Sequence, residues 1–291
     1  MGYVLHLAIM AVIYMILAVS LNLLVGYSRI ISLAHGAFYG IGAYLSAIVA
    51  LQFGAGLFSA LVIAFVGTAF VAMLAGWPIL RLREDYLVLT LIALQIVITG
   101  VITNWEALTR GPFGLYGIPR PAVFGWRATS ELAYLGVSLA VGAVVAAIAW
   151  RLHHAPFARI LRALREDELV TAMMGKNVAW AKLRVFGVSA GMAGVAGCLY
   201  AHYVNFISPA NFTLIESIFV FTCVVIGGPG NFWGPLVGTL FLVLLPEALR
   251  FIGLPSGIAA PVQQVVYGAV LIGLMLVRPQ GLIGEFNFRE E

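Results

Sequence analysis

Charged residues are scarce in this sequence: they make up only 10% of its 291 residues, against about 25% in a typical soluble domain. Hydrophobic residues account for 62%, and a soluble fold of this size could not keep so much apolar surface away from water. The surrounding solvent is therefore predicted to be lipid. The formal net charge of +4 is small and matters through where the charges lie, so no nucleic-acid partner is implied.

Cysteine is almost absent as well. Only Cys198 and Cys223 occur, both inside apolar runs, so the sequence predicts neither a disulfide framework nor a metal site. We expect both to be buried as small apolar residues. The sequence also contains no Walker A phosphate loop and no HExxH, CxxC or GxSxG motif. The chain is therefore expected not to be an enzyme and to hold no cofactor of its own.

Ionisable residues are missing from the centres of the predicted membrane spans. A charge at mid-membrane costs at least about 2.5–3.5 kcal/mol. Glu216, Glu247, His6, His35 and His202 all fall near span ends. Transporters driven by an ion gradient usually carry a central charge. If this chain pumps, another subunit is expected to consume the fuel.

Long hydrophobic runs dominate what is present. A helix needs about 20 apolar residues to cross the hydrocarbon core. The sequence predicts an all-α, polytopic bundle of about 8–10 transmembrane helices, forming a single domain over residues 1–291. The spans are predicted near 3–25, 32–53, 58–80, 86–104, 132–150, 185–206, 212–227, 233–250 and 260–277. Glycine and polar residues interrupt 32–53 and 212–227, so either could be a broken or re-entrant segment.

Basic residues orient these spans. Seven of the sixteen Lys and Arg residues lie between Arg151 and Arg184. The positive-inside rule places this segment in the cytoplasm. Counting spans outward from it predicts an external N-terminus, an external loop at about 105–131 and a cytoplasmic C-terminus.

The cytoplasmic segment 156–183 reads PFARILRALREDELVTAMMGKNVAWAKL. Apolar residues recur in it at helical spacing, with arginines on the other face, which predicts an amphipathic helix that stops at Gly175. The first apolar set is Phe157, Ile160, Leu161 and Leu164, and the second is Leu169, Val170, Ala172 and Met173. Such a helix could lie on lipid headgroups or dock a soluble partner. The acidic triplet 166–168 favours a partner, because anionic lipid would repel it.

Small residues recur at the four-residue spacing that lets helices pack closely in lipid. The pairs are Gly36 with Gly40, Gly187 with Gly191, and Gly230 with Gly234. The segment GNFWGPLVG at 230 echoes GAFYGIGAY at 36, and both open a span predicted to run from cytoplasm to exterior. This is weak evidence for two halves related by a repeat, with a transport pathway between them. Packing alone is the simpler interpretation, and a role in the pathway is the alternative.

Several blocks of the sequence together resemble one transporter family. They are LNLLVGYSRIISLAHGAFYGIGAY at 21–44, TRGPFGLYGIPRP at 109–121, PFARILRALREDELVTAMMGKN at 156–177, AGCLYAHYVNFISPANF at 196–212, VIGGPGNFWGPLVGTLFLVLLPEALR at 225–250 and LVRPQGLIG at 276–284. In this order, and over most of the chain, they resemble the permease of bacterial branched-chain amino-acid ABC importers of the LivM type. The sequence departs from the family pattern at Arg29, at Ala34 before His35, and at Arg110 before Gly111.

The resemblance implies a multi-pass protein of the bacterial inner membrane, in contact with membrane lipid, that pairs with a homologous second permease. Two cytoplasmic ATPase subunits would bind ATP and Mg²⁺, and a periplasmic substrate-binding protein would deliver the substrate. The segment at about 152–183 then corresponds to the family's coupling helix. The resemblance assigns ATPase coupling to Arg165, Glu166, Asp167, Glu168, Ala172, Met173 and Gly175. Only Gly175 matches the EAA-x₃-G signature of ABC permeases, since Leu169 stands at the first position of that signature.

Five residues are candidates for the pathway or its gate: Asn22, Ser32, His35, Tyr39 and Glu216. Ser32 and His35 are expected at a cytoplasmic turn, where they either satisfy backbone groups at a helix start or line the inner mouth of the pathway. The resembled family also has branches for urea, amides and aromatic acids, so the substrate is left open. A passive channel is the alternative class, although a simple pore does not require the cytoplasmic helix.

Overall fold

The structure is a computed structural model that describes residues 2–120, 122–123, 126–127 and 130–250, with residues 262, 265–266, 268–269, 272–273 and 281–283. Seven helices in this part of the chain are long and apolar enough to cross a membrane. The predicted all-α, polytopic membrane fold is confirmed.

Eight of the predicted spans correspond to helices. These are α1 (Gly2–Ser28), α2 (His35–Phe53), α3 (Leu57–Ile79), α4 (Glu84–Asn104), α6 (Glu131–His154), α9 (Val178–Val204), α10 (Leu214–Gly227) and α11 (Gly234–Arg250). Most bounds lie within a few residues of the prediction, and α9 begins earlier than expected. Most of the predicted span 260–277 lies outside the described residues.

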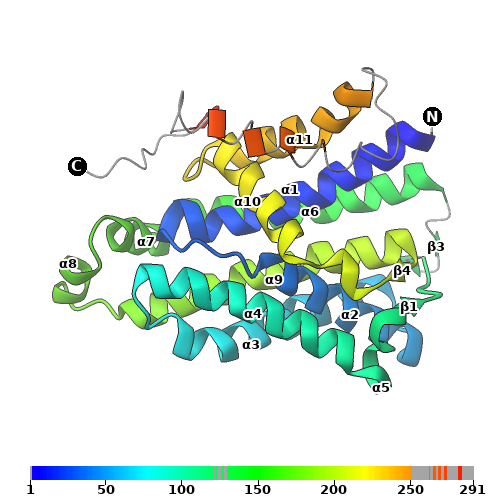
Figure 1. The fold of residues 1–291 in the computed structure, drawn as a ribbon, viewed down its shortest axis with the longest axis horizontal. Helices are drawn as coiled ribbons and strands as arrows, with labels where there is room; N and C mark the ends of the chain where they lie inside the picture. Colours follow the sequence, from blue (N-terminus) through cyan, green and yellow to red (C-terminus); the bar gives the residue numbers. More distant parts are fainter. Residues whose placement is uncertain are drawn as a thin grey trace.

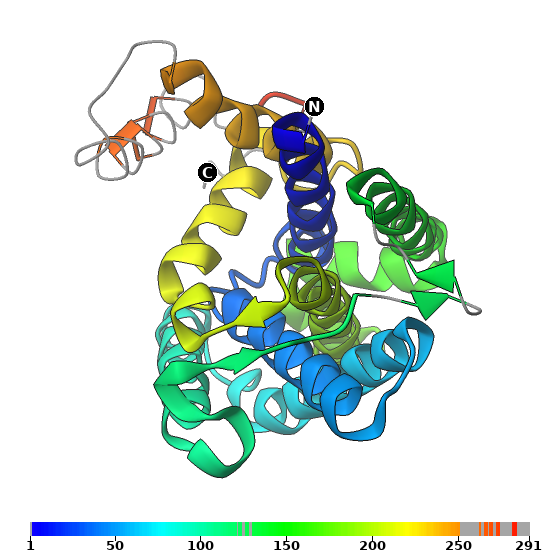
Figure 2. The same cartoon turned by 90° about the vertical axis from the view of Figure 1, so that its right-hand side faces the viewer.

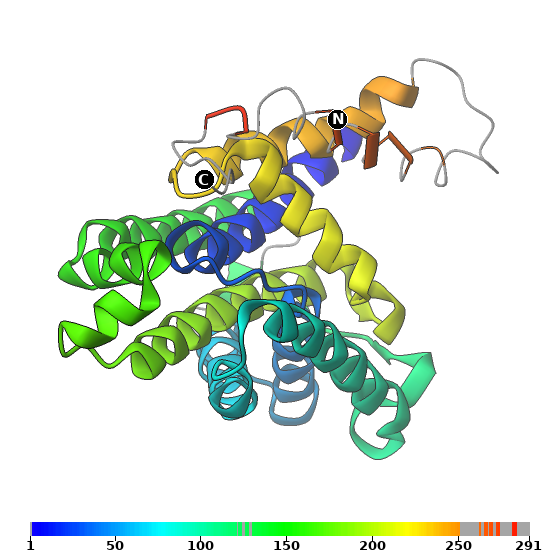
Figure 3. The same ribbon diagram turned by 60° about the vertical axis from the view of Figure 1, so that its left-hand side comes forward.

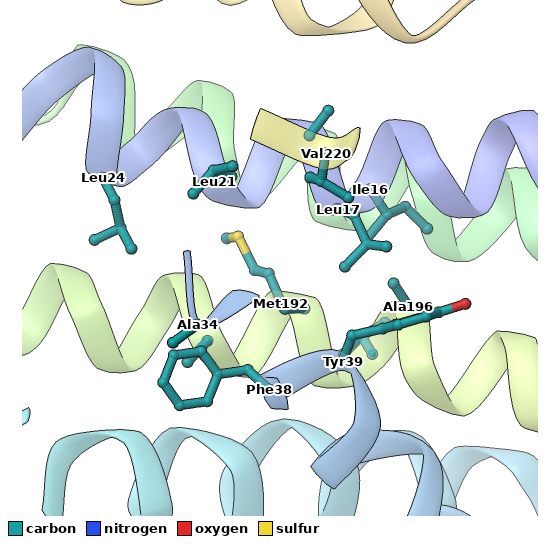
Figure 4. Close-up of a cluster of buried hydrophobic side chains, with 14 of the residues drawn as sticks. Ile16, Leu17, Leu21, Leu24, Ala34, Phe38, Tyr39, Met192, Ala196 and Val220 are labelled. Atoms are coloured by element: carbon teal, nitrogen blue, oxygen red, sulfur yellow. The ribbon is translucent and has the colours of Figure 1, made fainter. Parts of the chain in front are cut away.

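Helix α9 is the central helix of the bundle. It packs against α1, α2 and α3, and the end-on view shows it enclosed by them (Figure 2). In the core, Leu17, Leu21 and Leu24 of α1 point toward Met192 of α9 and Phe38 of α2 (Figure 4). The two cysteines are free and buried, as predicted.

Glycines bring the backbones of α2 and α9 into direct contact. A Cβ atom on Gly42 would overlap the backbone of Gly194, and one on Gly197 would overlap the backbone of Tyr39. Such approach maximises van der Waals contact where lipid supplies no hydrophobic driving force between helices. The predicted glycines Gly187 and Gly191 face α3 instead, where they adjoin the side chains of Met73 and Phe65.

One end of the bundle carries the N-terminus and most of the short elements (Figure 1). These are α5 (Glu106–Thr109), η1 (Gly111–Phe113), β1 (Leu115–Tyr116), β2 (Ala122–Val123), β3 (Trp126–Arg127), β4 (Phe206–Ile207) and η2 (Pro209–Asn211). Strand β1 pairs antiparallel with β4, and β2 with β3. The Tyr3 hydroxyl donates a hydrogen bond to Glu247, which ties α1 to α11 here. The basic residues predict that this end is external.

The opposite end, predicted to be cytoplasmic, carries two short helices, α7 (Pro156–Glu166) and α8 (Glu168–Met173). The prediction of one amphipathic helix over this segment is therefore wrong. Asp167 is extended, and its carboxylate accepts hydrogen bonds from the backbone N–H groups of Leu169 at 2.8 Å and Val170 at 3.0 Å. An aspartate at this position caps a new helix, so the chain changes direction between the two apolar sets. We call α7 and α8 together the coupling arm.

We predict that Gly42→Leu separates α2 from α9 and lowers the thermal unfolding temperature of the detergent-purified protein, because the backbone of Gly194 leaves no room for the added side chain. The expected loss of stability is about 1–3 kcal/mol, read as a shift in a thermal melt. Gly136→Leu on α6 is the matched control, since nothing lies within 4 Å of a Cβ built there. Equal melting temperatures for the two variants would contradict the close contact.

Candidate functional site

Helix α2 begins deep inside the bundle rather than at its cytoplasmic surface. His35, its first residue, has its ring Nε2 2.8 Å from the Ser20 hydroxyl of α1. Helix α1 ends at Ser28, and at a rise of 1.5 Å per residue Ser20 lies about 12 Å along the helix from that end. Residues 29–34 therefore run inward without helical structure, and the expectation that Ser32 and His35 sit at a cytoplasmic turn is wrong.

The first turn of α2 is capped by side chains from two other helices. The Gly36 N–H donates to the Ser217 hydroxyl of α10 at 2.8 Å, and the Ala37 N–H donates to the Gln95 carbonyl oxygen of α4 at 2.6 Å. Ser217 also donates to Gln95 at 3.1 Å, and the Gln95 amide donates to the Phe212 carbonyl at 2.9 Å. In lipid every backbone polar group must find an internal partner, so these side chains make the buried helix start possible.

Gln95 and Ser217 were missed by the sequence reasoning. Gln95 is 1% exposed and Ser217 is fully buried. The available signal was Gln95 itself, a lone amide in the apolar run LVLTLIALQIVITG. A polar side chain at that position in a span needs a buried partner.

Helix α10 begins at the same place and crosses the bundle at a steep angle (Figure 3). Glu216 lies in its first turn, and the Tyr14 hydroxyl donates to the carboxylate, with both oxygens at 3.3 Å. Tyr14 is at the middle of α1, so the end of α10 coincides with the centre of the bundle. The expectation that no ionisable group lies at mid-depth is therefore wrong, because a span end was equated with a membrane surface.

Three further polar atoms are buried around this junction. Ser32 Oγ, His35 Nδ1 and the Tyr39 hydroxyl have no hydrogen-bond partner among the described residues. The Tyr39 ring packs against Phe212 and Tyr200, with centroids 5.1 and 5.5 Å away. A Cβ atom on Gly36 would meet the Ser217 hydroxyl, and one on Gly40 would meet the Phe212 ring. Four of the five predicted pathway residues are thus placed in or beside one polar junction, which we define as Ser20, His35, Gln95, Glu216 and Ser217.

The fifth, Asn22, lies away from this junction and holds the turn between α10 and α11. Its amide donates to the Asn231 carbonyl at 2.9 Å, and its carbonyl oxygen accepts from the Gly230 N–H at 3.0 Å. Gly230 has a positive φ of 88° and packs against Gly26 of α1 so closely that a Cβ on Gly26 would overlap it. Gly234, the other glycine of the predicted pair, is the first residue of α11.

The coupling arm is attached to the bundle at two points. The Arg165 guanidinium donates to the Gly26 carbonyl of α1 at 2.9 Å and pairs with Glu166 at 3.1 Å. On α8, Glu168 pairs with Lys182 of α9 at 2.5 Å. Of the predicted carboxylates, Glu168 therefore ties the arm to α9, Glu166 pairs within α7, and Asp167 caps α8.

The outer surface of α8 is apolar and uncovered. Met173 is 84% exposed, Leu169 72% and Met174 71%, and Ala172 is exposed beside them. Gly175 adopts a positive φ of 75° and ends the arm. An apolar surface at the end predicted to be cytoplasmic, tied to α9 by the Glu168–Lys182 ion pair, fits a protein partner better than water.

Comparisons with known proteins agree with these features. The family of permease components of branched-chain amino acid transport systems matches residues 3–275 of the chain. The high-affinity branched-chain amino acid transport system permease protein LivM of Salmonella typhimurium is 33% identical over 95% of this chain and 69% of its own length. The permease protein LivH of the same high-affinity system in Salmonella typhimurium is 27% identical over 93% of this chain and 91% of its own length. The ribose import permease protein RbsC of Haemophilus influenzae is 28% identical over 51% of each chain. No solved structure matches significantly.

We predict that Gln95→Leu destabilises the bundle by about 1–3 kcal/mol, because the Ala37 N–H loses its side-chain acceptor and the Ser217 hydroxyl loses the oxygen to which it donates, both inside an apolar region. The measurement is thermal unfolding in detergent. Gln52→Leu, at an exposed position of α2, is the matched control and should leave stability unchanged. If both variants melt like the wild type, the cap is not a structural requirement.

Proposed function

Because the chain belongs to the family of permease components of branched-chain amino acid transport systems, we propose that it is the pathway-forming membrane subunit of an ATP-driven ABC importer. It is a transport subunit and not an enzyme. The proposed substrates are branched-chain or related amino acids, and the proposed location is the bacterial inner membrane. The alternative substrates are urea, amides and aromatic acids, which other branches of the family transport.

The coupling arm is the observation that carries this proposal. Its exposed residues Leu169 and Met173 offer a cytoplasmic surface for an ATPase, and its inner side is bonded to α1 and α9. A partner that moves the arm therefore moves two membrane helices. A passive channel has no use for such an attachment. The ATP and Mg²⁺ belong, in this proposal, to two ATPase subunits.

The proposed pathway partner is a second, homologous permease. Two differently named permease proteins of one transport system in Salmonella typhimurium are both similar to this chain, over 95% and 93% of its length. This supports pairing between two related permeases, with a periplasmic binding protein delivering substrate to the pair.

Glu216 is the group we assign to the substrate. An amino acid carries an ammonium group that must be compensated in a low-dielectric region, and an ionisable residue inside a membrane is a functional candidate by default. Among the acidic side chains of the described residues, only Glu216 lies beside the middle of α1, and no described cation pairs with it. The apolar side chain of the substrate then needs few polar contacts.

We predict that the double variant Leu169→Glu/Met173→Glu prevents the cognate ATPase from co-purifying with the permease and abolishes ATP-dependent uptake in proteoliposomes. The added charges would be desolvated in a protein groove at a cost of several kcal/mol. Phe113→Glu is the matched control, since its exposure of 85% is close to the 84% of Met173 but it lies at the end predicted to be external. Co-purification and uptake that survive the double variant would remove the arm as the docking surface. Uphill accumulation by the permease without any ATPase would refute the importer itself.

We predict that Glu216→Gln lowers uptake of a branched-chain amino acid at least about tenfold, or about 1.4 kcal/mol, because the ammonium loses its counter-charge. Glu216→Asp should restore part of the activity. The measurement is initial uptake rate in proteoliposomes containing the complete importer, with Glu106→Gln at the exposed helix α5 as control. Wild-type rates for Glu216→Gln would contradict the assignment and favour an uncharged substrate.

A further inference from the structure

A cavity of about 450 Å³ opens between two groups of helices at the cytoplasmic end. One wall is formed by α1, α6 and α7 and includes Leu23 and Phe157, and the other is formed by α3 and α9 and includes Phe65, Met73 and Val188. Figure 3 shows α1 and α6 above α3 and α9 at this end, with the coupling arm beside them. We call this cavity the inner groove.

The inner groove lies within the cytoplasmic half of the membrane. Leu23 is about 8 Å from the end of α1 and Met73 about 9 Å from the end of α3, at 1.5 Å per residue. Along α3 the groove extends from Phe65 to Met73, or about 12 Å. Its lining is almost entirely apolar, so at this depth an acyl chain fits it and water does not.

Aromatic and basic side chains stand together at the cytoplasmic ends of α3 and α9. The Trp77 and Trp180 rings meet edge to face with centroids 5.7 Å apart. The Arg81 guanidinium lies 4.9 Å from the Trp77 ring, and that of Arg184 lies 5.6 Å from the Trp180 ring. Tryptophan is enriched at the headgroup level of membranes. The group therefore marks where a lipid phosphate would lie.

Arg184 connects this headgroup level with the inner groove. It lines the groove, it is exposed, and it pairs with no carboxylate of the described residues. A second cation is close to the lining, because Arg162 of α7 contacts the ring of the groove residue His153 at 3.3 Å. The cytoplasmic leaflet is the anionic one, so the charges of these arginines complement its phosphates.

We propose that the inner groove binds one acyl chain of an anionic phospholipid of the cytoplasmic leaflet, with the lipid phosphate at Arg184. Because α7 forms part of one wall and is bonded through Arg165 to α1, a bound lipid fills the space between the coupling arm and α3. The lipid thereby holds the arm in one position relative to α9. This site is separate from the polar junction and does not depend on the substrate.

The test is native mass spectrometry of the full-length permease in detergent, titrated with phosphatidylglycerol and with phosphatidylethanolamine. We expect tighter retention of phosphatidylglycerol, and at least a tenfold weaker affinity for it in Arg184→Gln. Arg159→Gln, an exposed arginine of α7 outside the groove lining, should bind like the wild type. Ala69→Phe fills the groove and should reduce retention of both lipids, whereas Ala147→Phe on the exposed face of α6 should not.

A second measurement covers the case in which Ala69→Phe fails to fold. Phosphatidylglycerol with brominated acyl chains should quench tryptophan fluorescence in the wild type, and Trp180→Phe should lower the quenched amplitude. Arg184→Gln should require more lipid for the same quenching. Equal phosphatidylglycerol affinity in the wild type and Arg184→Gln would overturn the proposal. Cross-links that place the second permease in the inner groove of the assembled pair would overturn it as well.

Discussion

The structure depends on how a helix can start inside a membrane. The first N–H groups of a helix lack the usual acceptor four residues earlier, and water is not available to those of α2 at this depth; in the first turn the Ala37 N–H also reaches the Ala34 carbonyl at 3.1 Å. Gln95 and Ser217 supply the acceptors, each from a different helix, at 2.6 and 2.8 Å. This cap satisfies the start of α2 inside the bundle, where the chain at 29–34 leads into it. His35 and Glu216 lie beside the cap, each in the first turn of its helix.

Helix α10 joins this cap to the attachment of the coupling arm. Its first turn contributes Ser217, and beyond its last turn Gly230 is held by Asn22 against Gly26. The carbonyl of Gly26 in turn accepts the hydrogen bond from Arg165. These contacts form a continuous set from α7 through the end of α1 to both ends of α10. These contacts connect α7 with the polar junction along α10, a helix of about 21 Å.

Composition and hydropathy were sufficient to predict the membrane class and eight of the helices, because burial in lipid requires long apolar runs. They could not show how deep in the bundle α2 begins. The start near residue 32 was predicted, but only the tertiary partners Ser20, Gln95 and Ser217 reveal that His35 lies in the interior. The same limit explains the error over Glu216, whose distance from a surface depends on the tilt of α10. The sequence does contain a signal for the break at Asp167, since an aspartate before ELVTAM is a helix-capping residue. The apolar periodicity continues across Asp167, however, and predicts a single helix.

The two copies of the Gly-x-Phe-aromatic-Gly pattern occupy related but unequal places. Both lie against the last third of α1: His35 beside Ser20, and Gly230 beside Asn22 and Gly26. In the first copy the glycines are inside α2, where Gly36 adjoins Ser217 of α10 and Gly40 the ring of Phe212, whereas in the second Gly230 belongs to a turn and only Gly234 is helical. A larger residue at Gly36 or Gly40 would meet these neighbours. The first copy consequently lies at the polar junction and the second beside Gly26, whose carbonyl binds Arg165 of the arm, so one local pattern packs against α1 at two different places.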